Sequence, residues 1–169
     1  MAYLRNSTFE TGLAGWNRIN GANQVTMAII NDGTARSGQN FLRAKSDVVD
    51  GSVGTDFAIP STSGAQPAQA DNAMNFSVGA LAYIRAAPGG PPVQGHFKLW
   101  SLGLESRPEN SNGTNFRVGN DWSLIMCALD GTSYQYLRAE NRYGFPTIRV
   151  EFYLQTPGAY LDIDTVFVS

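Results

Sequence analysis

Three carboxylates in this sequence have types and positions that suggest chemistry. Glu10 lies in the stretch "NSTFETGLAGW", directly after Phe9 and close to Gly12, Gly15 and Trp16. A carboxylate lodged between core aromatics costs free energy unless it is paired or binds a cation. Asp162 and Asp164 in "LDIDT" are two residues apart, so on a strand they point to the same side. That spacing is typical of metal-site or surface residues.

The residue types that most often perform catalysis are scarce. His96 is the single histidine, and no nucleophile elbow, glycine-rich phosphate loop or metal-ligand histidine spacing accompanies it. Cys127 is the single cysteine and lies in the apolar run "SLIMCAL". This position favours an inert buried thiol over a nucleophile. We therefore expect that this protein is not an enzyme and has no catalytic residues.

Three segments alternate between apolar and polar or aromatic residues: "NFSVGALAYIR", "HFKLWSL" and "TIRVEFYL". On a strand, one set of positions builds the core and the other projects outward. The outward set comprises Tyr83, Arg85, Lys98, Trp100, Arg149, Glu151 and Tyr153. All of these except Arg85 are our candidate carbohydrate-binding residues.

Sugar binding would use both kinds of side chain in this set, provided that the strands belong to one sheet. The C–H face of a pyranose can lie on Trp100 or Tyr153, while charged groups bond its hydroxyls. The same composition also suits a protein–protein interface or an ordinary exposed strand face. The residues alone leave these alternatives open.

The elements that position these side chains are short runs rich in alternating, β-branched or aromatic residues, separated by Gly, Pro, Asn and Asp clusters. These runs predict strands, and no segment predicts a helix. The strands expected are 24–30, 40–45, 53–59, 75–85, 96–102, 122–129, 134–139, 147–154 and 159–168. A long crossing loop is expected over 103–121. The predicted fold class is all-β, a jelly-roll β-sandwich of two antiparallel sheets, with residues 1–169 as a single domain.

Composition narrows the possible partners. The 169 residues are 43% hydrophobic and 15% charged, which is typical of a folded domain rather than a disordered segment. The net charge of −2 and the absence of a basic stripe predict no nucleic-acid partner. No run is apolar enough to predict insertion into a membrane, and the first residues do not read as a signal peptide.

Several motifs, taken in order, resemble the galactose-binding-like jelly-roll superfamily, in particular the carbohydrate-binding modules of xylanases and cellulases. "NSTFETGLAGW" is similar to their N-terminal signature, and "ARSGQNFLRA" to the segment that leads into a second strand. "NFSVGALAYIR", "DWSLIMCAL" and "AYLDIDTVFV" are similar to later strands of these modules. The closing strand departs from the usual Asp-Asp-Val, because Thr165 follows Asp164.

The resemblance implies a structural Ca²⁺. In such modules the first and last strands are neighbours, and the Glu after Phe and the first Asp of the closing strand hold the ion with backbone carbonyls. The matching residues here are Glu10 and Asp164, whose oxygens suit calcium. The alternative is that either carboxylate pairs with an arginine such as Arg5 or Arg43, or is exposed to solvent.

Two functions follow as hypotheses. The first is a non-catalytic carbohydrate-binding or adhesion module, displayed on a phage particle. The second is a virion structural protein, such as a minor tail or capsid-decoration protein, whose jelly roll contacts proteins without binding sugar. Both place the chain on a virion surface or outside the cell, with a glycan, another virion protein or a second copy as partner. One fold supports either function.

Overall fold

The computed structural model describes residues 8–58, 78–102, 108–129 and 147–168. These residues form strands and one short 3₁₀ turn, η1 (Ala22–Gln24). The strands are β1 (Trp16–Arg18), β2 (Val25–Ile30), β3 (Phe41–Ser46), β4 (Gly51–Ala58), β5 (Val78–Ala86), β6 (Val93–Leu102), β7 (Pro108–Val118), β8 (Ser123–Leu129), β9 (Thr147–Leu154) and β10 (Tyr160–Val168). No helix in the described ranges has the length and hydropathy to cross a membrane.

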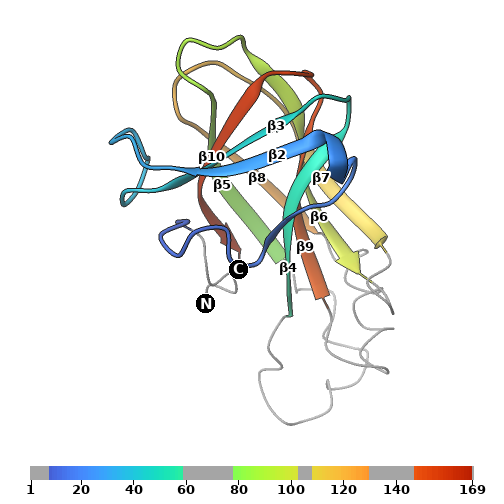
Figure 1. The fold of residues 1–169 in the computed structure, drawn as a ribbon. Coiled ribbons are helices and arrows are strands. Elements are labelled where there is room, and N and C mark those ends of the chain that lie inside the picture. The colour runs from blue at the N-terminus through green and yellow to red at the C-terminus, as the bar shows by residue number, and fades with distance from the viewer. Residues whose placement is uncertain (1–7, 59–77, 103–107, 130–146, 169) are drawn as a thin grey trace, which may run out of the picture.

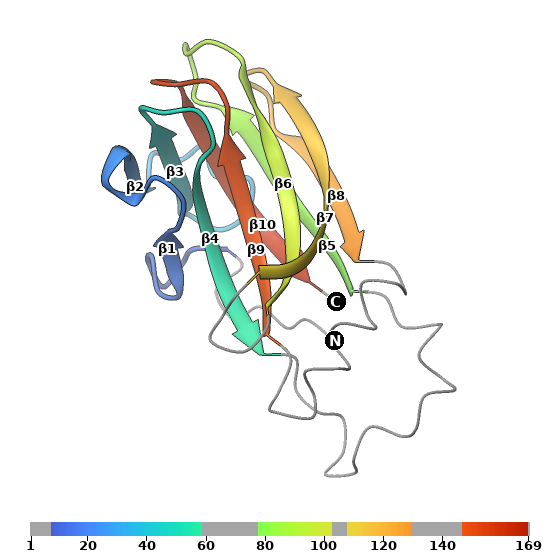
Figure 2. The same cartoon turned by 90° about the vertical axis from the view of Figure 1, so that its right-hand side faces the viewer.

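The strands form two five-stranded antiparallel sheets packed face to face (Figure 1). Sheet A has the order β1-β4-β9-β6-β7, and sheet B has the order β2-β3-β10-β5-β8. In Figure 2, β4, β9 and β6 run side by side in one layer. The predicted all-β jelly-roll sandwich of two antiparallel sheets is therefore confirmed.

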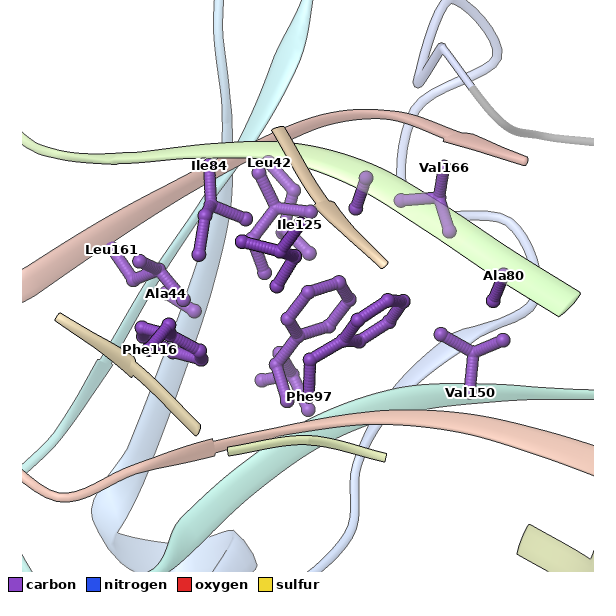
Figure 3. Close-up of a cluster of buried hydrophobic side chains, with 14 of the residues drawn as sticks. Leu42, Ala44, Ala80, Ile84, Phe97, Phe116, Ile125, Val150, Leu161 and Val166 are labelled. Atoms are coloured by element: carbon purple, nitrogen blue, oxygen red, sulfur yellow. The ribbon is translucent and has the colours of Figure 1, made fainter. Parts of the chain in front are cut away.

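The core lies between the sheets and is built from alternate residues of their strands (Figure 3). Phe97 of β6 and Phe152 of β9 are opposite one another, with ring centroids 4.6 Å apart and both side chains fully buried. Sheet B supplies residues such as Ile84 and Leu42 from the other side. Each buried side chain of this size contributes about 1.5–3 kcal/mol.

The opening stretch closes one end of this core. Phe9 is fully buried and lies 5.1 Å from the ring of Trp16, which in turn stacks 6.2 Å from Phe152. Between them Gly12 and Gly15 have φ of +79° and +83°, a backbone conformation that other residues rarely adopt. The expected burial of Phe9 and Trp16 around a glycine turn is confirmed.

Residues 108–118 correct one prediction, because they form β7 where the sequence predicts part of a loop over 103–121. β7 pairs with β6 along its length. The side chains of Asn112 and Thr114 donate hydrogen bonds to the backbone oxygens of Ala128 and Met126 on β8. Asn and Gly have low strand propensity, so the composition of this segment did not predict a strand. Its pairing with β6 and its bonds to β8 stabilise it instead. The short β1 was also missed, and the predicted strand 134–139 lies outside the described residues.

A second correction concerns the first and last strands, which the resemblance placed side by side. β1 is an edge strand of sheet A and pairs with β4. β10 is the central strand of sheet B, between β3 and β5. The physical reason is that β1 has only three residues and follows the glycine turn, which directs it to the edge beside β4.

Asp162 links the three central strands of sheet B through hydrogen bonds. It is fully buried and lies directly opposite Arg43 on β3 and Arg85 on β5. Its Oδ1 accepts from Arg43 Nε at 2.6 Å, and its Oδ2 accepts from Arg85 Nε at 3.0 Å. The expectation that Asp162 is a surface or metal-site residue is wrong, because the two guanidinium groups already partner both of its oxygens.

Replacing Asp162 with alanine should destabilise the fold by about 3–5 kcal/mol, because Arg85 then remains as a buried cation without its partner. Urea unfolding followed by tryptophan fluorescence measures this change. The matched control is Asp47→Ala, which removes the carboxylate of a surface pair with Lys45 and should cost less than about 1 kcal/mol. Equal costs for the two variants would contradict this account of sheet B.

Candidate functional site

The outer face of sheet A carries three rows of side chains that cross β4, β9, β6 and β7. They follow from the strand register, since residues two apart share a face. The rows are Ser52–Tyr153–His96–Asn115, Gly54–Glu151–Lys98–Gly113 and Asp56–Arg149–Trp100–Ser111. Five of the six candidate carbohydrate-binding residues therefore lie on one surface, at its centre: Lys98, Trp100, Arg149, Glu151 and Tyr153.

Lys98 lies between the two aromatic residues of this surface. Its Nζ is 5.2 Å from the centroid of the Trp100 ring and 5.3 Å from that of the Tyr153 ring. All three side chains are partly exposed. Trp100 Nε1 is buried and has no hydrogen-bond partner in the described part of the chain. The centre of the surface is thus a cation held between two ring systems.

Tyr153 remains protonated at any physiological pH. Burial raises the pKa of its hydroxyl well above the ordinary value, and the negative charge of the neighbouring Glu151 raises it further. The phenol is therefore a neutral group that can both donate and accept a hydrogen bond.

Two carboxylates of the outer face already have partners. Glu151 is only 2% exposed, and one of its oxygens accepts from the hydroxyl of Ser52 on β4. Asp56 accepts from Arg149 through both oxygens, at 2.7 and 3.0 Å. This contact raises the pKa of the Arg149 guanidinium. These bonds fix Glu151 and Arg149 in place and leave Lys98 with no recorded ion pair among the described residues.

Ser52 and Asp56 are residues that the sequence reasoning missed. The strand predicted over 53–59 contains Asp56. Its apolar and polar residues do not alternate clearly, because Gly54 and Thr55 both follow Val53 before Asp56. His96 was not among the candidate binding residues. Here its Nδ1 lies within hydrogen-bond distance of Asn115 Oδ1 on β7. These polar groups extend the surface on both sides of the predicted centre.

Glycines stand at the two ends of the central row. Gly54 is opposite Glu151, and Gly113 is opposite Lys98. A Cβ added to Gly113 would lie 2.7 Å from Cγ of Lys98, so the lysine stem passes over this glycine. A Cβ added to Gly54 would lie 2.8 Å from Cδ1 of Ile19, so Ile19 covers that end of the row.

Tyr83 is not part of this surface, and its inclusion was wrong. It lies on β5 in sheet B, opposite Leu124 on β8 and Asp164 on β10. The guanidinium carbon of Arg36 lies 4.4 Å from the centroid of its ring. Alternation assigns a residue to a face of its own strand, but it does not say which sheet the strand joins. The condition that all three strands share a sheet fails for β5 alone.

Glu10 and Asp164 both hold the loop over residues 31–40. Glu10 Oε1 accepts from the backbone N–H groups of Gln39 and Asn40, each at 2.9 Å. Asp164 Oδ2 accepts from the N–H of Ser37 at 2.8 Å. Residues more than a hundred positions apart thus converge on one short segment, although the first and last strands are not neighbours.

Asp164 is fully buried, and burial raises the pKa of its carboxyl above the usual range. No ion pair is recorded for Glu10 or Asp164 in the described residues, and Arg43 pairs with Asp162 instead. Arg5 lies outside the described residues. No group of three or more Asp, Glu, His or Cys that could hold a metal occurs in the described ranges. The calcium assignment stays a prediction.

Cys127 packs against the core from β8. Burial raises the pKa of its thiol to about 12, so the reactive thiolate is scarce at neutral pH. This environment agrees with the inert thiol that the sequence predicts.

Comparison with known proteins finds the same fold in several solved structures. No family model matches the sequence, and no curated protein matches it significantly. Among solved structures, the CBM22-1 xylan-binding domain of Paenibacillus barcinonensis Xyn10C is similar, with a TM-score of 0.61 and 12% identity. That match covers 99% of this chain and 91% of the domain. The fold is thus the jelly roll of the carbohydrate-binding modules that the sequence resembles.

Two longer proteins contain the same fold as one part. An arabinose-bound α-L-arabinofuranosidase matches with a TM-score of 0.69 and 16% identity, over 99% of this chain and 26% of the enzyme. The enzymatically active domain of tailspike protein 4 of bacteriophage CBA120 matches with a TM-score of 0.63 and 11% identity. That match covers 99% of this chain and 21% of the tailspike chain.

Proposed function

We propose that this chain is a non-catalytic carbohydrate-binding module and that its ligand lies on the outer face of sheet A. The observation that carries the proposal is the central group of Trp100, Tyr153 and Lys98. It combines two aromatic rings with polar groups whose positions are fixed by strand pairing. Sugars need both features, because a pyranose has apolar C–H faces and a rim of hydroxyls.

The polar groups around the rings supply suitable hydrogen-bond partners. Asp56 and Arg149 form a bidentate pair on one side, and His96 and Asn115 form a second pair on the other. Pre-organised side chains lose little conformational entropy on binding, so their hydrogen bonds contribute more to affinity. The fold shared with a xylan-binding domain supports the proposal.

A virion location is the finer part of the proposal. The support for it is the fold shared with a region of a phage tailspike. On a particle, many copies of a weak sugar-binding surface would act together, and such multivalency raises the overall avidity without new contacts. We therefore propose adhesion to a glycan as the role in that setting.

Replacing Trp100 with alanine should weaken retention on the cognate polysaccharide at least about tenfold, because one stacking face is lost. Affinity electrophoresis against a polysaccharide panel measures the change. Tyr160→Ala is the control, since it removes an exposed ring from sheet B. Thermal unfolding should show only a small change for Trp100→Ala, because this side chain is partly exposed. Unchanged retention in Trp100→Ala would overturn the assignment of the surface.

We also propose that Glu10 and Asp164 hold a structural Ca²⁺ at the loop over residues 31–40. The fully buried Asp164 has only N–H and hydroxyl partners recorded, and a divalent cation would balance its charge. Two carboxylates are too few ligands for calcium, so backbone carbonyls or water would complete the shell. The ion would tie the loop to both ends of the described chain.

Calcium should raise the melting temperature by about 5–10 °C over that in EDTA, because an ion that binds only the folded state stabilises it. Differential scanning calorimetry measures the shift, with Mg²⁺ as the control ion. In Glu10→Gln the response to calcium should shrink. A melting temperature that changes with neither EDTA nor calcium would contradict the metal assignment.

Protein contact is the second candidate function, and an apolar row on sheet B favours it. Phe167 on β10, Leu81 on β5 and Met126 on β8 are directly opposite one another on the outer face. Met126 is 61% exposed and the nearby Leu124 is 48% exposed. Exposed apolar residues in one patch are typical of interfaces.

The two candidates predict different results for one variant. If the apolar row joins two copies of this chain, Met126→Glu should abolish self-association in sedimentation equilibrium. The variant should leave polysaccharide retention unchanged, because Met126 lies on the other sheet. A wild-type protein that stays monomeric at high concentration would exclude this contact between copies.

A further inference from the structure

Lys98 has a position that a purely stacking surface does not need. Its ammonium lies 5.2 Å from the centroid of the Trp100 ring and 5.3 Å from that of the Tyr153 ring. It also stands in the middle row, directly opposite Glu151 and Gly113. A ligand that binds here therefore meets a positive charge at the centre of the aromatic group.

The other charged side chains in the three rows defined above are partnered. Arg149 is held by both oxygens of Asp56. Glu151 is almost fully buried and accepts from Ser52. For Lys98, by contrast, no ion pair is recorded in the described ranges, and its neighbours are ring faces. A ring face attracts a cation through its quadrupole but does not neutralise the charge or use up its hydrogen-bond donors.

The surface next to Lys98 is open on the side of β7. The residue opposite Lys98 on this strand, Gly113, is exposed and has no side chain. Arg117 lies two rows further along β7 than Gly113 and is exposed. The exposed cations near the centre thus lie on the β6 and β7 side, while the Glu151 carboxylate lies beneath the surface.

We infer that the ligand is an acidic polysaccharide, in which a uronate carboxylate pairs with Lys98 while ring C–H groups lie against Trp100 and Tyr153. The inference rests on the proposed function and names its substrate class. The carboxylate of a hexuronate projects from the edge of the sugar ring, so one residue can meet an aromatic face and the ammonium together. A charge-assisted hydrogen bond to the ammonium is about twice as strong as a neutral one.

The ligand itself provides the sharpest test. Retention is measured on glucuronoxylan, polygalacturonate, alginate and hyaluronate, each beside its carboxyl-reduced form, and on neutral xylan and galactan. We expect at least one acidic polymer to be retained, and its reduced form to bind at least tenfold more weakly. Raising the salt from 50 to 500 mM should weaken the acidic complex much more than any neutral one.

The outcomes separate the inference from the proposed function. Equal retention of an acidic polymer and its reduced form, or retention of neutral polymers alone, overturns the inference and leaves sugar binding standing. Retention of none of the polymers overturns both.

Variants of Lys98 test the residue directly. Lys98→Met keeps an unbranched apolar stem between the rings. In this variant the acidic polymer and its carboxyl-reduced form should bind about equally, and the salt dependence should be lost. Lys98→Arg keeps the charge and should retain most of the preference. Calorimetry of both variants reports folding, and the wild-type comparison of acidic and reduced polymers stands if either variant fails to fold. A Lys98→Met protein that keeps the full preference overturns the assignment to Lys98.

Discussion

The stack of Phe97 on Phe152 is the contact on which the proposed binding surface depends. These residues are directly opposite one another in the β6–β9 pair, with their rings 4.6 Å apart and fully buried. Because side chains alternate, this inner pair places Lys98 opposite Glu151 and Trp100 opposite Arg149 on the outside. A slip of one residue would turn both aromatic rings to solvent and the charges into the core, so the register is strongly specified. The hydrophobic core therefore sets the geometry of the polar surface, and loss of core packing would disperse that surface.

The two sheets use their outer faces differently. On sheet B the loop over residues 31–40 lies against the strands, since Trp122 Nε1 donates to Thr34 O and Arg85 donates to the Thr34 hydroxyl. Arg85 also lies 4.4 Å from the ring of Trp122, and the buried Phe41 packs edge-on to that ring. Glu10 and Asp164 hold the same loop by its backbone. These contacts cover the charged centre of sheet B, whereas the described part of sheet A keeps Lys98, Trp100 and Tyr153 partly exposed.

Much of the fold and part of the candidate site could be predicted from the sequence, for physical reasons. β9 places a large apolar residue at every second position, and the middle of β6 does so at Phe97 and Leu99. Their inward and outward faces were therefore clear, and five of the six candidate residues share one surface. Tyr83 was misplaced because alternation carries no information on which sheet a strand joins. β7 was missed because its Asn and Gly residues have low strand propensity, and its stability comes from pairing with β6 and from side-chain bonds to β8. Asp162 illustrates the same limit, since its two arginine partners lie on strands far away in sequence.

Glu151 explains why a lysine rather than an apolar residue stands at the centre of the surface. A carboxylate that is 2% exposed loses most of its hydration, and its hydrogen bond from the Ser52 hydroxyl recovers only part of that free energy. Lys98, directly opposite in the register, supplies a compensating positive potential without a close ion pair, because the rings of Trp100 and Tyr153 hold its ammonium above the sheet. The ammonium is thereby flanked by rings at its sides, and no close carboxylate neutralises it. Its remaining hydrogen-bonding direction is outward, which is the side from which the proposed ligand would approach.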